Sequence, residues 1–115
     1  MAFKSLPLLF VLISIFVASI SYEVIATGEY QPIPNLNDPL VVASATFAVN
    51  EYNKQVKTKL EFVSISQGEY QVVNGINYKL DIVARNGINL EKYEAIVNVK
   101  PRSTKPSQLL SFKKV

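Results

Sequence analysis

The residues whose types and spacing suggest a function are five consecutive ones, Gln71, Val72, Val73, Asn74 and Gly75. An Asn-Gly pair between two β-type segments is a strong signal for a tight hairpin turn. The pattern therefore predicts that Val72 and Val73 lie at the tip of a hairpin and form an apolar wedge. Such a wedge would bind an apolar cleft, where each valine contributes about 1.5 to 3 kcal/mol on burial. The alternative is a hairpin turn with no role in binding.

Side chains that commonly carry catalysis or bind metals are scarce. The chain contains no Cys and no His, which excludes Ser/His/Asp and Cys/His catalysis and zinc sites built from these ligands. Paired carboxylates could still act as they do in glycosidases, but no acidic residue lies in a recognisable catalytic setting. We therefore predict that the protein is not an enzyme and uses no metal and no cofactor.

The first residues have the pattern of a secretory signal peptide. Lys4 supplies a positive charge, and residues 6–20 form an uncharged apolar run that is shorter than the roughly 20 residues of a membrane span. We predict a signal peptide over residues 1–26, with cleavage after Ala26 or after Ser21, and a single domain over residues 27–115. The mature protein would be secreted, outside the cell or in the secretory pathway or vacuole, with no membrane contact. The alternative is a retained anchor or buried core segment.

The charge of the chain gives little indication of a partner. Twelve Lys and Arg against nine Asp and Glu leave a formal net charge of +3. These basic residues are spread along the chain without a run of five or more, which argues against nucleic-acid binding. Without cysteine, the domain has no disulfides and must be stabilised by core packing.

The elements that must position the hairpin follow from the periodicity of the sequence. Residues 27–36 predict an extended arm because of their Pro and Gly content. Asp38 and Pro39 are typical of a helix start, and an apolar stripe extends the predicted helix to about Lys57. We predict that this stripe packs against the core. It consists of Val41, Val42, Ala45, Ala48, Val49, Tyr52 and Val56.

Four later segments have strand character, namely residues 60–73, 78–85, 92–100 and 108–113. Gly68 is predicted to be a bulge or a bend within the first of them. Asn-Gly turns at Asn74 and Asn86 predict antiparallel hairpins. We therefore predict an α+β fold in which one helix packs across a four- to five-stranded antiparallel sheet, the fifth strand being supplied by the arm. The other face of the sheet should be polar.

Several of these features occur together in the order and spacing of plant cystatins. They are the Gln-x-Val-x-Gly hairpin, the helical segment Phe47-Ala48-Val49-Asn50-Glu51-Tyr52-Asn53, Gly28 near the mature start, and Lys100-Pro101. The chain resembles this family over residues 28–112. The resemblance implies a reversible, tight-binding inhibitor of papain-like cysteine proteases, which occludes the active-site cleft with the arm and two hairpin loops. The implied contacts are Gly28, Gln71, Val72, Val73, Asn74, Gly75, Pro101 and Arg102.

The sequence departs from the family pattern most clearly at Arg102, because Trp usually follows the proline there. A buried interface Trp often contributes about 2 kcal/mol or more. We therefore expect inhibition to persist with altered selectivity and to rely more on the first hairpin and the arm. Arg102 would recover part of the loss by stacking or by pairing with an acidic protease rim, or else it is a solvated loop charge. Smaller departures are Ser44, Thr46 and Thr27.

Two other classes of function are compatible with the sequence. One is a non-inhibitory binding or storage protein on the same fold, and the other, which has less support, is a small enzyme. We expect a monomer, with a domain-swapped dimer as the alternative, because a hairpin loop under strain can act as a hinge.

Overall fold

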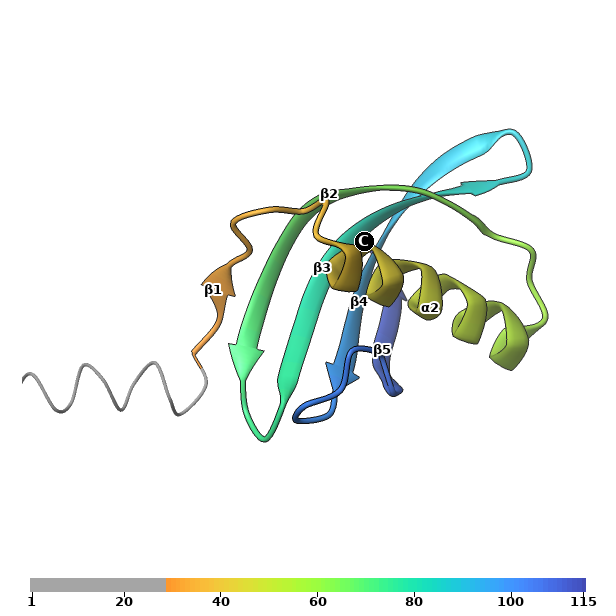
Figure 1. Cartoon of the computed structure of the whole chain (residues 1–115). Helices are drawn as coiled ribbons and strands as arrows, with labels where there is room; N and C mark the ends of the chain where they lie inside the picture. Colours follow the sequence, from red (N-terminus) through yellow and green to blue (C-terminus); the bar gives the residue numbers. More distant parts are fainter. Residues whose placement is uncertain (1–28) are drawn as a thin grey trace, which may run out of the picture.

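The computed structural model of the chain describes residues 29–115. Within this part, one helix packs across one face of a five-stranded antiparallel sheet, which confirms the predicted α+β fold (Figure 1). The strands lie in the sheet in chain order. The predicted signal peptide and Gly28 lie outside the described residues. The elements are β1 (Gln31–Pro32), α2 (Pro39–Val56), β2 (Glu61–Val72), β3 (Ile76–Asn86), β4 (Asn89–Val99) and β5 (Gln108–Lys114).

Helix α2 begins where the sequence predicts. The carboxylate of Asp38 accepts a hydrogen bond from the backbone N–H of Leu40 at 3.0 Å, and a proline occupies the first turn. The helix ends at Lys57, which has the left-handed conformation of a C-cap. Val56, in the last turn of α2, is 48% exposed, so its predicted place in the core face is wrong, because this end of the helix projects beyond the strands (Figure 1). No helix among residues 29–115 is long and apolar enough to cross a bilayer.

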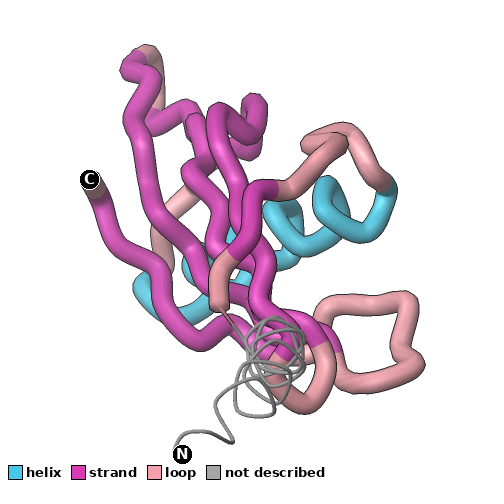
Figure 2. Tube along the Cα trace, turned by 90° about the vertical axis from the view of Figure 1, so that its left-hand side faces the viewer, coloured by secondary structure: helices cyan, strands magenta, loops and turns pink. Residues whose placement is uncertain are grey.

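The hydrophobic core lies between α2 and the sheet. Figure 1 shows the helix in front of the strands, and Figure 2 shows it crossing behind them from the other view. Alternate residues of β3 and β4 point toward the helix and are buried, and the intervening residues face away from it and are mostly polar. This alternation agrees with the period of two read from the sequence. The buried strand residues are Tyr78, Leu80, Ile82, Ala84, Tyr93, Ala95, Val97 and Val99.

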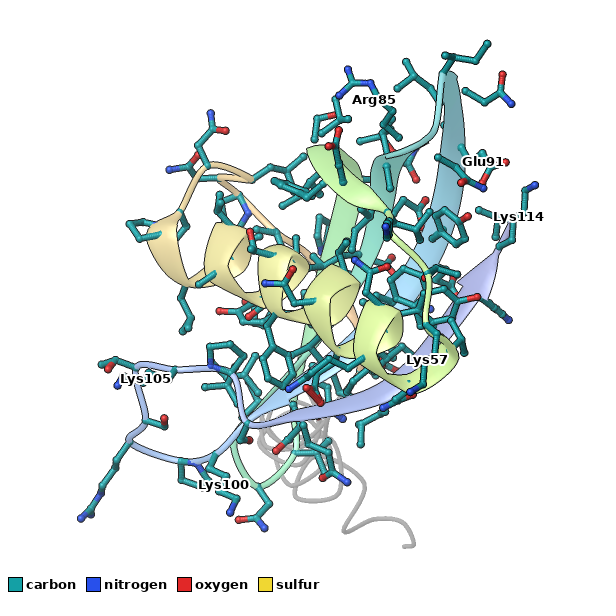
Figure 3. All side chains as sticks on the ribbon, turned by 90° about the vertical axis from the view of Figure 1, so that its right-hand side faces the viewer. Lys57, Arg85, Glu91, Lys100, Lys105 and Lys114 are labelled. Carbon is teal, nitrogen blue, oxygen red and sulfur yellow. The ribbon has the colours of Figure 1, made fainter. Side chains whose placement is uncertain are left out.

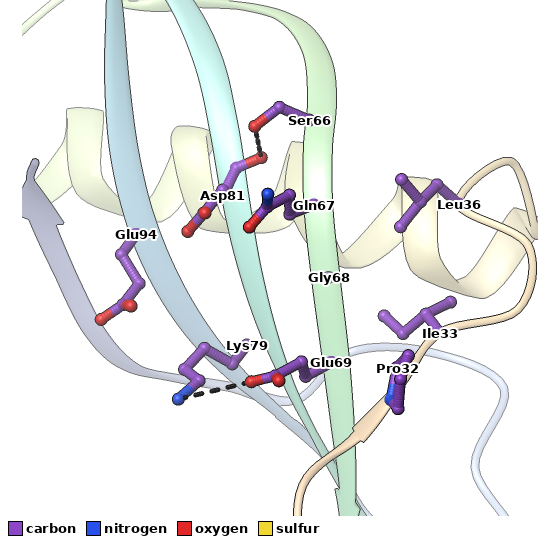
Figure 4. Close-up of a pocket in the computed structure, with 10 residues that line it drawn as sticks. All are labelled: Pro32, Ile33, Leu36, Ser66, Gln67, Gly68, Glu69, Lys79, Asp81 and Glu94. Carbon is purple, nitrogen blue, oxygen red and sulfur yellow. Dashed lines mark hydrogen bonds and ion pairs between the residues drawn. The ribbon is translucent and has the colours of Figure 1, made fainter.

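Gly68 is not the bulge that the sequence predicts. The pairing of β2 with β3 is irregular at Val63 and at Ser66, whereas Gly68 pairs regularly with Leu80. A Cβ atom at Gly68 would lie 2.8 Å from Cδ1 of Ile33 and 3.0 Å from Cδ2 of Leu36. Figure 4 shows these two side chains beside the glycine. The missing side chain therefore allows the segment after β1 to pack closely against the sheet.

Two residues of the helical signature have structural roles. The side-chain amide of Asn53 donates to the carbonyl of Leu60 at 2.9 Å and accepts from the N–H of Leu60 at 3.0 Å, which ties the end of α2 to the start of β2. The ring of Tyr52 stacks on Phe112 of β5, with 4.2 Å between the centroids. These contacts agree with the expectation that Tyr52 serves helix packing.

Candidate binding edge

The predicted site residues in the described chain lie at one end of the sheet. Residues 73–75 join β2 to β3, and β4 ends at Val99, directly opposite Ile76. The tip of this first hairpin and the loop between β4 and β5 therefore lie side by side, at the bottom of Figure 1. We call this end of the sheet, formed by residues 71–76 and 100–107, the hairpin edge.

The two valines of the first hairpin are exposed at its tip, as the sequence predicts. Val72 is 42% exposed and Val73 is 45% exposed. The turn is closed by a hydrogen bond from the N–H of Val73 to the carbonyl of Gly75 at 3.1 Å. Asn74 and Gly75 have φ values of 49° and 106°, which Asn and Gly tolerate better than other residues. The backbone therefore holds both valines outward in a defined shape.

Gly75 is the point where the first hairpin contacts the second loop. A Cβ atom at this position would lie 2.3 Å from the carbonyl oxygen of Val99 and 3.1 Å from Cδ of Pro101. Only glycine fits so close to another backbone. Pro101 therefore supports the tip from the side, which places both predicted binding elements in direct contact.

A row of amide side chains crosses the outer face of the sheet beside the hairpin edge. Nδ2 of Asn77 donates to Oε1 of Gln71 at 3.1 Å, and Nδ2 of Asn98 donates to Oδ1 of Asn77 at 2.8 Å. We call Gln71, Asn77 and Asn98 the amide ladder. At its far side, Oγ of Ser107 donates to the carbonyl of Asn98 at 2.9 Å. The ladder links the first hairpin to the second loop across three strands.

The ladder gives Gln71 a structural contact beside its predicted contact with a protease, and it includes Asn77 and Asn98, which were not predicted from the sequence. Gln71 was predicted to be a contact residue, yet its side chain is half-buried and bonded to Asn77. Asn77 and Asn98 gave no signal beyond their polar positions in alternating strands. Their partners lie on other strands, so only the register between β2, β3 and β4 brings the three amides together.

The second loop begins with a β-turn that contains Pro101 and Arg102. The N–H of Ser103 donates to the carbonyl of Lys100 at 3.1 Å, and Arg102 has a φ of 63°. Because proline cannot adopt a positive φ, these features define a type II turn, in which glycine is the usual residue at the position of Arg102. The exposed arginine thus stands where the resemblance to plant cystatins leads us to expect a tryptophan.

The arm lies along the edge of β2 that is not paired with β3. Gln31 of β1 pairs with Tyr70, and the N–H of Ile33 donates to the carbonyl of Gly68 at 3.0 Å. Nζ of Lys79 lies 4.4 Å from the centroid of the Tyr30 ring. Because β1 is antiparallel to β2, the N-terminal end of β1 is the end nearer the hairpin edge. The predicted contact at Gly28 stays a prediction.

Two of the three groups with shifted pKa values in the described residues, Glu91 and Tyr93, lie toward the other end of β4. The third is Tyr78 of β3, whose pKa is raised by burial and by the charge of Asp38. Burial raises the pKa of Tyr93 to about 12, and its hydrogen bond to Glu91, with 2.6 Å between the oxygens, contributes to the shift. Hydrogen bonds from Tyr93, Lys114 and Asn86, in that order of importance, lower the pKa of Glu91. Residues 29–115 contain no cluster of His, Cys, Asp and Glu that could hold a metal ion. The described hairpin edge is therefore suited to binding by shape, apolar contact and charge.

Comparisons with known proteins give two kinds of match. Residues 33–115 match the sequence model of a family described as "Aspartic acid proteinase inhibitor". The chain is 46% identical over 77 residues to "Cysteine proteinase inhibitor 1" of Actinidia chinensis var. chinensis, which covers 67% of this chain and 66% of the relative. It is 47% identical over 75 residues to "Cysteine proteinase inhibitor 5" of Arabidopsis thaliana, which covers 64% of this chain and 62% of the relative.

A third relative is matched over a longer stretch. "Putative cysteine proteinase inhibitor 7" of Oryza sativa subsp. japonica is 33% identical over 90 residues, which is 76% of this chain and 76% of the relative. The chain spans less than two thirds of the length of the Actinidia and Arabidopsis proteins that it matches. The names of all these proteins refer to proteinase inhibition, and they differ in the class of proteinase.

Proposed function

Because this chain belongs to the cystatin family of plant proteinase inhibitors, we propose that it is a reversible, tight-binding inhibitor of papain-like cysteine proteases. The observation that carries the proposal is the first hairpin. It holds two exposed valines on a tip whose backbone is closed by its own hydrogen bond and supported by Pro101. These residues carry the Gln-x-Val-x-Gly pattern, one of the four elements that together resemble plant cystatins and imply this function.

The proposed mechanism is occlusion of the active-site cleft. Val72 and Val73 enter the apolar cleft and each contribute about 1.5 to 3 kcal/mol on burial. Because the tip is already folded, little conformational entropy is lost on binding. Pro101 and Arg102 contact the protease beside the tip, and the arm at Gly28 contacts it on the other side. Secretion after removal of residues 1–26 belongs to the same proposal.

A titration against active papain tests this proposal. Increasing amounts of the purified protein should abolish papain activity at a 1:1 ratio, and dilution or a competing substrate should restore it. Mass spectrometry of the recovered inhibitor should show an uncleaved chain, since occlusion offers no scissile bond to the enzyme. Papain that stays fully active at a large excess of the protein would contradict the proposal.

A second candidate function is inhibition of an aspartic proteinase. Two observations favour it: the match of residues 33–115 to a family described by that activity, and the exposed Arg102 where Trp is expected. The same titration with a pepsin-type enzyme separates the two candidates. If neither class of proteinase is inhibited, the non-inhibitory binding or storage protein becomes the better interpretation.

A further inference from the structure

The loop between β4 and β5 carries three cations that have no ion-pair partner in the described part of the chain. Lys100, Arg102 and Lys105 are exposed, and none of them forms an ion pair with a carboxylate of residues 29–115. No acidic residue follows Glu94 in the sequence. Figure 3 shows Lys100 and Lys105 on this loop, apart from the other labelled residues. The loop therefore adds an uncompensated positive charge to the hairpin edge.

The backbone of this loop is held in place by its own hydrogen bonds. Oγ of Ser103 donates to the carbonyl of Lys105 at 3.0 Å and accepts from the N–H of Lys105 at 3.1 Å. The N–H of Ser107 donates to the carbonyl of Asn98 at 2.9 Å, which anchors the end of the loop to β4. The three cations are therefore presented on a folded loop, and binding does not require the loop to become ordered.

Arg102 keeps a backbone conformation that its residue type disfavours. Three non-glycine residues in the described chain have positive φ: Lys57, Asn74 and Arg102. Lys57 is a helix C-cap, where this conformation is common, and Asn tolerates it. Arg102 has neither explanation, and glycine would be favoured at its turn position. A retained unfavourable conformation points to a use for the side chain.

We propose that this loop is an electrostatic docking element that selects proteases with carboxylates on the rim of the active-site cleft. The inference rests on the proposed protease-inhibitory function and names the kind of target. Because Pro101 contacts Gly75, the cations flank the valine tip, so they would face the cleft rim as the valines enter the cleft. Such charges act mainly on the rate of association, since they attract the partner before contact.

Association kinetics with matched variants test the inference. The loop variant replaces Lys100, Arg102 and Lys105 by Gln. The control variant replaces Lys57, Lys59 and Lys92 by Gln, because these cations are also exposed and form no ion pair within residues 29–115. They lie away from the hairpin edge, Lys57 and Lys59 between α2 and β2 and Lys92 near the start of β4. The target is one papain-like protease in two forms, one with its natural cleft-rim carboxylates and one with these changed to the corresponding amides.

At low ionic strength, the loop variant should associate about tenfold more slowly with the carboxylate form, and the control variant less than twofold more slowly. The difference should disappear near 1 M salt, where charges are screened beyond about 3 Å. It should also disappear with the amide form. The dissociation rate constants should change less than the association rate constants, because the valine contacts are unchanged and a rim charge acts mainly on association.

A further variant and two possible results separate the failure of this inference from the failure of the proposed function. Arg102→Gly removes the charge and relieves the positive φ, so it should raise the melting temperature while it slows association. Equal association rates for wild type, loop variant and control would overturn the inference and leave the proposed function intact. A wild-type protein that inhibits neither form of the protease would overturn the proposed function, and the inference with it.

Discussion

Asn98 of β4 donates a hydrogen bond from Nδ2 to Oδ1 of Asn77 of β3 at 2.8 Å, directly between paired positions of the two strands. Asn77 in turn holds the side chain of Gln71. These bonds join the strand that leads into the first hairpin to the strand that leads into the second loop. The relative position of the two predicted binding elements therefore depends on side chains as well as on backbone pairing.

Loss of the central amide of the ladder should weaken both stability and inhibition. Asn77→Ala removes two hydrogen bonds, which should lower the free energy of unfolding by about 1 to 2 kcal/mol. The inhibition constant should rise by about three- to tenfold, because the tips lose their alignment. Gln67→Ala, at an exposed position of β2, is the matched control in urea unfolding and protease inhibition. Equal inhibition constants for both variants would show that the ladder has no role in binding.

Substitution of Gly75 and of Gly87 should distinguish the turn that supports inhibition from a turn whose glycine serves only backbone conformation. Gly75→Ala places a Cβ against the carbonyl oxygen of Val99, and we expect it to cost about 3 kcal/mol of stability and to weaken inhibition. Gly87 has a φ of 65°, but a Cβ atom at this position would have no neighbour within 4 Å. Gly87→Ala should therefore lower the free energy of unfolding by only about 1 kcal/mol. Its inhibition constant should match that of the wild type. A loss of inhibition in Gly87→Ala would refute this assignment of roles.

The valines at the tip should contribute to binding and little to stability. Val72→Ser together with Val73→Ser should raise the inhibition constant about 100-fold or more, since two buried valines are lost from the interface. The free energy of unfolding should change by less than about 0.5 kcal/mol per site, because both side chains are exposed. The control carries Ile88→Ser and Leu90→Ser on the opposite hairpin, where Ile88 is 96% exposed. Similar losses of inhibition in both double variants would argue against a specific tip.

Gly68 should matter for the attachment of the arm. Gly68→Ala would bring a Cβ atom within 2.8 Å of Ile33 Cδ1 and 3.1 Å of Leu80 Cδ2. Because these are ends of flexible side chains, we expect a cost of about 1 to 2 kcal/mol. The amide of Ile33, which donates to the carbonyl of Gly68, should exchange with deuterium faster. Unchanged exchange at Ile33, compared with Ser66→Ala as control, would contradict this prediction.

Alkaline pH should destabilise the fold through Tyr93. Its folded-state pKa is raised from 10.0 to about 12, so the folded protein holds this proton more tightly than the unfolded chain does. The resulting stabilisation is complete below pH 10 and is lost as the pH rises toward 12. Urea unfolding at pH 9 to 12 should show a steeper loss of stability in the wild type than in Tyr93→Phe. Parallel pH profiles for the two proteins would contradict the assignment.

Acid pH should act on the partner of Tyr93 with the opposite sign. The pKa of Glu91 is lowered below its ordinary value of 4.5, and the hydrogen bond from Tyr93 is the largest cause. Its contribution is therefore present above pH 4.5 and is lost as the pH falls below that value. Tyr93→Phe should make this acid transition shallower, which the same unfolding series at pH 2 to 6 would measure.

Local signals in the sequence were reliable where neighbouring residues decide the conformation. Asp38 and Pro39 start the helix, and the two Asn-Gly pairs lie at the β2–β3 and β3–β4 turns, as predicted. The predictions for Val56 and Gly68 were wrong because both depend on distant partners. Val56 follows the helical period but extends beyond the sheet, and Gly68 is small because Ile33 and Leu36 pack against it.

The sequence by itself determined the α+β class, the hairpin turns and the alternation of buried and exposed strand residues, because these follow from backbone preferences and periodicity over a few residues. Only the tertiary structure decided how the hairpin edge is assembled. Gly75 meets Val99 and Pro101, and Asn98 bonds to Asn77, although these partners lie more than 20 positions apart in the chain. The hydrogen bond of Asn77 to Gln71 across the first hairpin completes the ladder. Such contacts depend on strand register, which is set by burial of the whole sheet face against α2.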